Sequence, residues 1–498
     1  MIRGIIFSQT VFSPRTLIDL IFFFSLISFL SACHNPSSHN NPFSLLSSSR
    51  TAQHDSKNDV YATLSATQHP RIVHLYGGTY HNPKLEHMLT NIVVKLANVA
   101  HNPNQIYRVT ILDSANVNAF ALPGGYIYVT RGMLALANDT SEVAAVLAHE
   151  IAHITANHGV LRLKKEVELK RADRITANLL SHSNTTSKHA ITGKQKLAQF
   201  SRNQELQADS IAIEMLNRAG YDPFAAARFL QSMETYSAFR NVSGAANSSL
   251  DFLATHPTTP QRIRLAIAKA RALHSSHVGR TERDNFLKSI DGMVFGGNHN
   301  EGYIRGNQFI HPQLQIAFSV PDTFTLKSSA HVVWASGPHK IALRFDAVPL
   351  PSGMSASDYL KSGWVAKLDH SSVHPIMIQS LPAARARATN EHWQFDVVVI
   401  PFKDYIFRFL TAAPHHSQNF ATVLNETLQS FHPLSPSALN QLKPLRIRIV
   451  RVKQGENVTN ISNKMHGIAH QEELFRIING LSPTQILHAG TWVKIITE

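Results

Sequence analysis

The sequence predicts three folded domains in series, and the spacing of apolar residues supports this fold class. Up to about residue 277, apolar residues recur mostly at helical spacing, with short strand-like runs between, which predicts a mainly α-helical domain with a small β-sheet. Strand-like runs then dominate and predict an α+β domain, and the last stretch predicts a small βααβ domain. A chain of 498 residues with 43% hydrophobic residues is ample for these cores.

Changes in composition place the domain boundaries. We expect a signal segment at 1–33, a flexible tether at 34–67, the helical domain at 68–277, the α+β domain at 278–433, a linker at 434–444 and the βααβ domain at 445–498. The tether is predicted because this stretch is rich in Ser, Asn and His and has few apolar residues.

Within the helical domain, the elements follow from periodicity and from turn residues. We expect a helix at 85–100, strands at 107–112 and 126–130, a helix from Asp139 to Gly159 and a helix at 201–219. Asp139, with Glu142 three residues later, forms a capping box pattern at the start of the second helix. In the α+β domain we expect strands at 314–320, 340–347, 393–400 and 405–410 and a helix at 419–430.

The N-terminus carries the pattern of an export signal. Arg3 and Arg15 precede an apolar run at 20–30, which is too short to span a bilayer comfortably. Small residues then lead to Cys33, the one cysteine of the chain, in a pattern that resembles a bacterial lipobox; a buried core cysteine is the alternative. Because His34 follows where an aspartate would suggest inner-membrane retention, we expect an exported periplasmic protein anchored by lipidated Cys33 to the outer membrane of a Gram-negative cell.

The formal net charge of +14 suits nucleic acid, a membrane surface or an anionic polymer. The export signal argues against nucleic acid, so no nucleic acid partner is expected.

The run 149–153, His-Glu-Ile-Ala-His, carries the chemistry of the helical domain. Residues four apart lie on one face of a helix, so His149 and His153 can share one metal ion. Glu150 then lies beside the metal and can accept a proton from an activated water. With 29 histidines in the chain, these five letters alone are not decisive.

A catalytic zinc site requires a third protein ligand. His158 follows His149 by nine residues, which turns it to the opposite side of a continuing helix and excludes it. Glu205 and Asp209 are four residues apart on the later helix, so they offer a ligand and a second carboxylate that can orient a ligating histidine. Two exposed helix carboxylates are the alternative.

These motifs resemble the gluzincin metallopeptidase family that includes HtpX, BepA and the CAAX prenyl endopeptidases. The resemblance covers roughly residues 77–272 and is closest to the soluble, exported lipoprotein branch. The residues that carry it are His149–His153, Glu205–Asp209, the upstream segment 118–134, Ala219–Pro223, and Thr255–Pro257 with Arg262.

The resemblance implies a zincin-type fold and one zinc ion (Zn2+) per chain. His149, His153 and Glu205 would bind the zinc, Glu150 would act as the general base, and Asp209 would support the ligands. His256 would stabilise the oxyanion or reach the zinc in a closed resting state; a structural histidine is the alternative. The segment with Asn118, Gly124, Gly125 and Tyr126 would supply an edge strand to which an extended peptide adds.

The C-terminal domain resembles a LysM domain, a module that binds peptidoglycan glycans. Val452–Val458, Asn479–Leu481 and Gly490–Ile495 carry this resemblance. The usual Gly-Asp-Thr is Gly455-Glu456-Asn457 here, so a degenerate module retained for packing is the alternative. The α+β domain shows no cluster of chemistry-bearing residues.

Together these features predict a lipid-anchored periplasmic zinc metalloendopeptidase that cleaves unfolded or misassembled envelope proteins. The alternative is an envelope assembly chaperone or scaffold, positioned at peptidoglycan, with little or no peptidase turnover.

Overall fold

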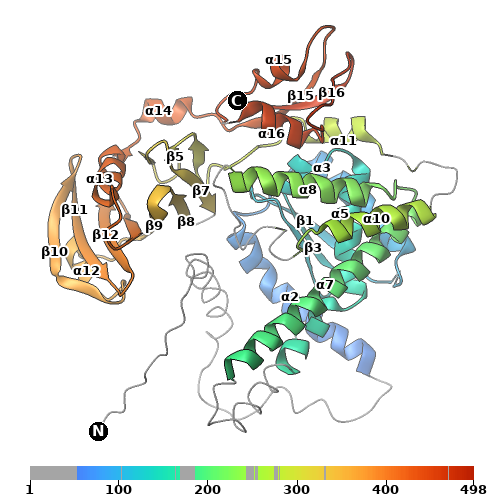
Figure 1. Cartoon of the computed structure of the whole chain (residues 1–498), viewed down its shortest axis with the longest axis horizontal. Helices are drawn as coiled ribbons and strands as arrows, with labels where there is room; N and C mark the ends of the chain where they lie inside the picture. Colours follow the sequence, from blue (N-terminus) through green and yellow to red (C-terminus); the bar gives the residue numbers. More distant parts are fainter. Residues whose placement is uncertain are drawn as a thin grey trace. The chain divides into compact units, whose positions relative to one another are not determined.

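A computed structural model describes residues 53–498, except 103, 163, 169–185, 243–251, 253–255, 274–278, 280, 330, 331 and 469 (Figure 1). The predicted signal segment and its Cys33 lie outside the described residues. Lys57–Glu498 form one compact unit. Among the residues that the structure describes, no helix combines the length and apolarity needed to cross a membrane.

A three-stranded sheet lies at the centre of the first domain. It consists of β1 (Arg108–Leu112), β2 (Ala119–Leu122) and β3 (Tyr126–Thr130) in the order β1-β3-β2. Strand β3 runs parallel to β1 and antiparallel to β2. Strand β2 therefore forms one edge of this sheet and β3 is its middle strand.

The two faces of this sheet are covered by different helices, because side chains alternate along a strand. Ile111 and Val129 belong to the core that includes residues of α3 (Pro83–Val99) and α5 (Thr140–Thr155). Leu112 and Tyr128 face the other way, against the end of α2 (Gln53–Leu75).

Helix α2 corrects the predicted tether at 34–67, because residues from Gln53 onward are helical. Polar composition led to the prediction of a tether, but the C-terminal turns of α2 are held by apolar contacts. Ile72 and Val73 pack against the buried Tyr76, Leu112 and Tyr128.

Helix α5 begins as predicted. Asp139 is its N-cap and accepts a hydrogen bond from the Glu142 backbone N–H at 2.8 Å, while the Glu142 carboxylate accepts from the Asn138 N–H at 2.8 Å. The predicted end at Gly159 is wrong, because α5 ends at Thr155. Asn157 then adopts a left-handed backbone with φ 54°, which breaks the helix, and a second helical stretch begins at His158.

The remaining helices of this domain are α4 (Arg131–Leu136), α7 (Thr186–Arg218), α8 (Ala225–Val242), α10 (Pro260–Leu273) and α11 (Arg283–Ile290). Of these, α7 is longer than predicted, α11 lies beyond the expected domain limit, and α4, α8 and α10 were not predicted. The predicted boundary at 278 is wrong, since Phe286, Leu287 and Ile290 of α11 are buried in the core of the first domain.

A β-rich domain follows, with seven antiparallel strands in the order β10-β11-β12-β13-β9-β8-β7. The strands are β7 (Thr325–Ser329), β8 (Val332–Ser336), β9 (Ala342–Pro349), β10 (Leu368–Ile378), β11 (Leu381–Thr389), β12 (Trp393–Phe402) and β13 (Tyr405–Pro414). A smaller sheet has the order β14-β6-β5-β4, from β4 (Tyr303–Arg305), β5 (Gln308–His311), β6 (Ile316–Ser319) and β14 (His432–Pro433). Helix α13 (Phe420–Ser430) contributes to one apolar core of this domain and α12 (Ala356–Lys361) to another.

The C-terminal domain has the predicted βααβ order. Its strands β15 (Arg446–Arg451) and β16 (Trp492–Thr497) pair antiparallel, and α15 (Val458–Ser462) and α16 (Gln471–Ile478) lie between them in sequence. The predicted linker at 434–444 contains a short helix, α14 (Pro436–Gln441).

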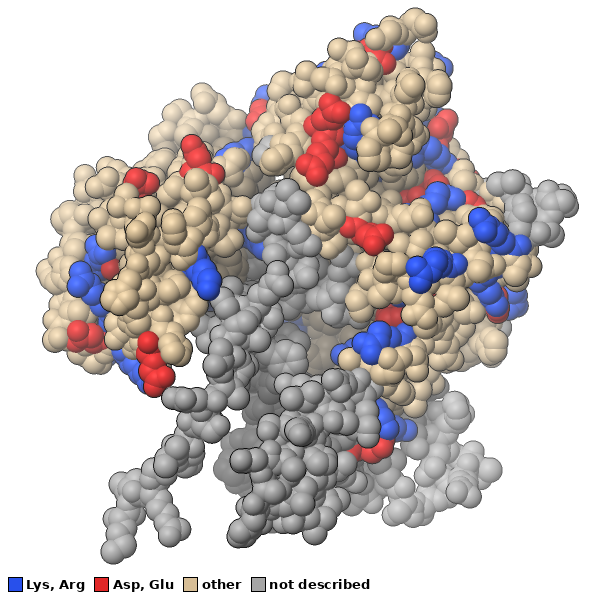
Figure 2. Space-filling view, in the orientation of Figure 1, with Lys and Arg blue, Asp and Glu red and all other residues tan. Residues whose placement is uncertain are grey.

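Contacts with the first domain fix one side of this C-terminal domain. The side chain of Lys494 on β16 is fully buried, and its Nζ donates to the backbone carbonyls of Ala135 at 2.9 Å and Ala137 at 2.6 Å. Ile447 and Ile477 belong to the core of the first domain. On the face drawn in Figure 2, basic and acidic side chains are interspersed. The excess of basic residues therefore forms no single basic patch on that face.

Candidate metal centre

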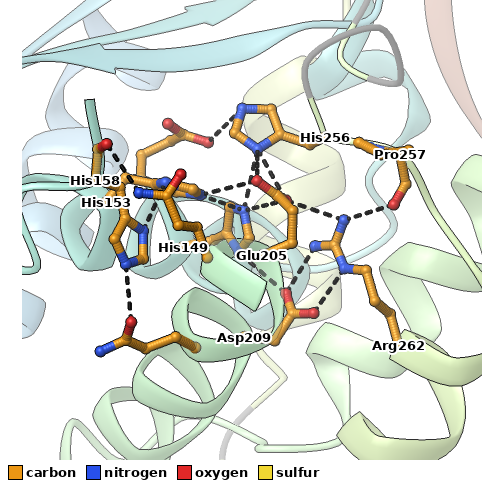
Figure 3. A network of polar contacts seen from close by, with 11 residues as sticks. His149, His153, His158, Glu205, Asp209, His256, Pro257 and Arg262 are labelled. Carbon is orange, nitrogen blue, oxygen red and sulfur yellow. Dashed lines mark hydrogen bonds and ion pairs between the residues drawn. The ribbon is translucent and has the colours of Figure 1, made fainter. Parts of the chain in front are cut away.

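Helix α5 positions three side chains of the site. His149 and Glu150 are 5% and 1% exposed, and His153 follows one turn later. The Nε2 atoms of His149 and His153 lie 3.0 Å apart, as the i, i+4 spacing predicts (Figure 3).

Helix α7 brings the predicted carboxylates to these histidines. Glu205 places Oε2 3.3 Å from His149 Nε2 and Oε1 3.5 Å from His153 Nε2. Asp209, one turn further on, places Oδ1 3.0 Å from His149 Nδ1. Asp209 therefore supports the far side of the His149 ring while Glu205 faces the near side.

His256, which precedes α10, completes a cluster of four side chains. Its Nδ1 lies 3.1 Å from Glu205 Oε2 and 3.3 Å from His149 Nε2. One ligand atom from each of His149, His153, Glu205 and His256 lies within 4.8 Å of the others. Of the two roles predicted for His256, this geometry matches that of a ligand in a closed site.

Arg262 on α10 connects the parts of the site, a role that sequence reasoning missed. Its guanidinium pairs with both oxygens of Asp209 at 2.7 and 2.8 Å, and NH1 lies 3.1 Å from Glu205 Oε2. The same NH1 donates to the Pro257 carbonyl at 3.0 Å (Figure 3). One guanidinium therefore holds both carboxylates of α7 and the residue next to His256.

His158 was excluded from the site by helical geometry, and the structure corrects part of that prediction. Its side chain is not one of the four clustered ligands, but its Nδ1 lies 3.0 Å from His153 Nδ1. The exclusion assumed that one helix continues from His149 to His158, but α5 ends at Thr155, so His158 is not turned to the opposite side of that helix. Asn157, a residue type that often adopts the left-handed conformation, was the signal in the sequence.

The charges of the site favour a cation between the ligands. Burial lowers the pKa of His149, but hydrogen bonds to Asp209 and Glu205 outweigh burial and raise it to about 10. Burial raises the pKa of Glu205, but the charge of His256 and the hydrogen bonds from His149 and His256 outweigh burial and lower it. The carboxylates therefore hold positive charge at the position where a metal ion would lie.

His153 and Glu150, the other two site residues on α5, remain neutral more readily. Burial, together with the charges of His149 and His256, lowers the pKa of His153. Burial raises the pKa of Glu150, and the charge of His256 opposes this only in part. A carboxylate with a raised pKa is suited to accept and return a proton near neutral pH.

The donor set fits a zinc ion. Three imidazole nitrogens and one carboxylate oxygen are ligands that zinc prefers, and all four converge on one point. Glu150 Oε1 is buried and has no hydrogen-bond partner within the described part of the chain, and it lies 3.7 Å from His256 Nε2 in an ion-pair contact. Asp209 and His158 lie at the far Nδ1 atoms of His149 and His153, where partners of ligating histidines are expected.

Comparison with known proteins agrees with this site. Residues 82–269, which include all four clustered ligands, match the model of peptidase family M48. Residues 82–269 are therefore similar to an M48 metallopeptidase domain. M48 peptidases depend on zinc, so the predicted enzyme class and cofactor agree with the family.

Curated relatives of the M48 domain come from mitochondria and bacteria. The mitochondrial metalloendopeptidase OMA1 of Schizosaccharomyces pombe is 28% identical over 186 residues, which cover 37% of this chain and 52% of that protein. The β-barrel assembly-enhancing protease of Escherichia coli K12 is 25% identical over 229 residues, which cover 44% of this chain and 46% of that protein. This chain therefore spans about half the length of these relatives.

Among solved structures, a chain from Bacteroides thetaiotaomicron VPI-5482 matches 30% of this chain and 55% of its own length, with 13% identity and a TM-score of 0.22. A TM-score this low carries no conclusion about the fold. The LysM-like identity of 445–498 lies outside the matched M48 region and stays a prediction.

The predicted substrate segment includes a strand that packs on α5, the helix that carries His149 and His153, but only part of the segment is an edge. Strand β2 is at the edge of the sheet and packs on α5. Tyr126 is in the middle strand β3, and Gly124 and Gly125 form the turn between the two strands with φ 84° and 89°. Asn118, just before β2, is buried and donates from Nδ2 to the Tyr76 hydroxyl at 3.0 Å. Within the described part of this predicted segment, β2 is therefore the one strand that lies at an edge of the sheet.

Proposed function

We propose that this protein is a zinc metalloendopeptidase that hydrolyses peptide bonds of unfolded or misassembled proteins. The observation that carries the proposal is the buried cluster of His149, His153, Glu205 and His256, with Glu150 beside it. A bound zinc ion supplies Lewis acidity that activates water and polarises the peptide carbonyl.

Glu150 performs the proton transfers in the proposed reaction. Its carboxylate accepts a proton from the attacking water as the C–O bond forms, and later gives that proton to the leaving amine nitrogen as the C–N bond breaks. Asp209 accepts a hydrogen bond from His149 Nδ1 and so keeps His149 Nε2 directed at the metal position. Arg262 holds Asp209 in that orientation.

An extended peptide would add to β2 through backbone hydrogen bonds. This edge lies on the sheet that packs against α5, which carries Glu150. Recognition through backbone atoms suits unfolded segments, because a folded protein already uses those atoms in its own structure.

Glu150→Gln tests the proposed reaction in the full chain. The variant should bind zinc with wild-type stoichiometry and lose casein cleavage by at least about 100-fold, because a general base contributes roughly that much. Glu214→Gln is the matched control, since Glu214 is an exposed carboxylate on α7 that pairs with Lys269. Equal cleavage by Glu150→Gln and wild type would overturn the enzyme proposal.

His256 gates the site in this proposal. Its Nδ1 fills the ligand position that a catalytic zinc leaves open for water, so the described arrangement is a closed resting state. His256→Ala should therefore raise the basal cleavage rate while zinc remains bound. A large fall in cleavage with zinc retained would instead assign oxyanion stabilisation to His256.

The closed arrangement also favours a second candidate, an envelope assembly chaperone or scaffold with little turnover. This function would hold if wild type, His256→Ala and Glu150→Gln all bind zinc, and none of them cleaves casein while all prevent its aggregation.

We further propose that the protein works in the bacterial envelope, anchored to the outer membrane through lipidated Cys33. The apolar run at 20–30 and the small residues before Cys33 support this location. The Escherichia coli relative is named for β-barrel assembly, which supports misassembled envelope proteins as substrates. Cys33→Ser should move the protein from the membrane fraction to the soluble fraction; an unchanged distribution would contradict the anchor.

Peptidoglycan is the proposed partner of the LysM-like domain 445–498. The βααβ order and the motif at 452–458 support this partner. The full chain should sediment with purified peptidoglycan sacculi, and a chain that stays in the supernatant would favour a module retained for packing.

A further inference from the structure

His158 lies between a metal ligand and a glutamine of α7. It is 2% exposed, and its Nδ1 lies 3.0 Å from His153 Nδ1. On the other side, its Nε2 lies 3.1 Å from Gln207 Oε1. The three side chains form a continuous line from α7 to the metal position (Figure 3).

The backbone around His158 is held as firmly as its ring. The left-handed residue Asn157 ends the preceding turn and returns the chain toward His153. The carbonyl of His158 accepts a hydrogen bond from Gln204 Nε2 at 2.9 Å. Gln204 and Gln207 flank Glu205 on α7, so one helix supplies a metal ligand and both groups that hold His158.

Donor and acceptor roles follow from Gln207. An amide oxygen can only accept, so His158 Nε2 carries the hydrogen and donates it to Gln207 Oε1. Neutral His158 then has a lone pair on Nδ1, which accepts a hydrogen from His153 Nδ1. His153 is left with its lone pair on Nε2, the atom that faces His149 and Glu205.

We propose that Gln207 and His158 form a neutral hydrogen-bond relay that positions His153 and selects the tautomer in which Nε2 binds the metal. This proposal rests on the proposed metal site. His158 and Gln207 are positioning residues, because they act through His153.

The two ligands of α5 are therefore supported in different ways. His149 is backed by the carboxylate of Asp209, which Arg262 in turn holds. His153 is backed by a neutral imidazole. A carboxylate partner makes the ligand more basic than a neutral acceptor does, so the relay contributes orientation and tautomer more than charge.

Zinc affinity of the full chain tests the relay without reference to cleavage. Losing a partner of a ligating histidine typically weakens metal binding about 10–100-fold. We expect His158→Phe, which keeps a planar ring but no acceptor, to weaken zinc binding within this range in competition with a chromophoric chelator. His158→Asn, which keeps an acceptor near the Nδ1 position, should recover most of the affinity.

Gln207→Ala provides a second variant with less risk to folding, since Gln207 is at the surface. It should weaken zinc binding by a smaller factor, because His158 then loses its fixed tautomer but keeps its ring. Nitrogen-15 NMR of labelled histidine should show His153 protonated at Nδ1 in the zinc-bound wild type.

The outcomes separate this proposal from the proposed function. If wild type binds no zinc, the metal site itself fails. If wild type binds zinc and both His158→Phe and Gln207→Ala bind it equally well, only the relay is overturned. If His158→Phe does not fold, Gln207→Ala and the comparison of His158→Asn with wild type decide the matter. Affinity for His158→Asn as weak as that of a folded His158→Phe would also contradict the relay.

Discussion

Lys494→Met should destabilise the first domain, although Lys494 belongs to the C-terminal domain. The ammonium group of Lys494 is buried at the C-terminal end of α4, where it donates to the carbonyls of Ala135 and Ala137. Both alanines are at most 4% exposed, so water cannot replace the lost donor. Methionine has a similar length and apolar stem, so the substitution removes the donor with little change in packing.

The expected cost follows from two opposing effects. Each buried acceptor left without a donor costs about 1–3 kcal/mol, or about 2–6 kcal/mol for the two carbonyls. Burial lowers the pKa of Lys494 well below its usual value, which shows that holding the charge is itself unfavourable. Relief of that burial offsets part of the loss, so we expect a net loss of roughly 2–4 kcal/mol.

Thermal unfolding of the full chain measures this cost. A loss of 2–4 kcal/mol corresponds to a melting temperature lower by roughly 4–16 °C for a domain of this size. Lys464→Met is the matched control, because Lys464 is on the same domain and its Nζ lies 2.6 Å from Glu456 Oε1 at the surface. That control should stay within about 1 kcal/mol of wild type.

One result would refute the reasoning. If Lys494→Met melts together with wild type and with Lys464→Met, the two carbonyls do not depend on Lys494.

Three further predictions concern pH and metal. Burial raises the pKa of Glu301 to about 8, so its contribution to stability is full below pH 4.5 and is lost as pH rises through 8. The free energy of unfolding of Glu301→Gln, measured relative to wild type by thermal melts at each pH, should therefore rise by roughly 3–5 kcal/mol between pH 4.5 and 9. A difference between the two proteins that stays constant with pH would contradict this. Burial, aided by His299, lowers the pKa of His311 to about 4, so stability present above pH 6.5 is lost as pH falls through 4. His311→Asn, which keeps an acceptor for the Leu314 N–H, should lose less stability than wild type as pH falls from 6.5 to 4. An equal loss in both proteins would exclude His311 as its source. Zinc added to metal-stripped protein at about 1,000 times its Kd should add about 4 kcal/mol of stability, and no change in the melting temperature would contradict a folded-state site.

The metal ligands were predictable because they follow from regular helices. The i, i+4 spacing of His149 and His153, and of Glu205 and Asp209, specifies their relative positions once each helix forms. Strands β1 and β3 and the Asp139 cap followed from equally local patterns, whereas β2 was expected only from the family resemblance. Local rules therefore account for the positions within each pair, whereas the family resemblance, not local pattern, assigned Glu205 and His256 to the same site as the two histidines.

The parts that sequence reasoning missed depend on where regular structure ends or on distant contacts. A single left-handed residue, Asn157, moves His158 from the far side of a helix to the side of His153. Arg262 and Lys494 bind groups more than 50 and more than 350 residues away in sequence. Strand β10 escaped prediction because its burial follows no regular alternation and its pairing shifts register between Asp369 and His374.

The position of β2 at an edge of the sheet has a consequence for how substrates would be chosen. An edge that pairs through backbone atoms reads little of the side-chain sequence and requires a stretch of chain released from its own fold. The cleavage rate of a segment would then be proportional to the fraction of time that the segment is locally unfolded. In a two-state opening, that fraction falls about tenfold for each 1.4 kcal/mol of local stability. Pairing with Ala119–Leu122 would thus select substrate segments by their local stability, and the least stable segment of a substrate protein would be cleaved first.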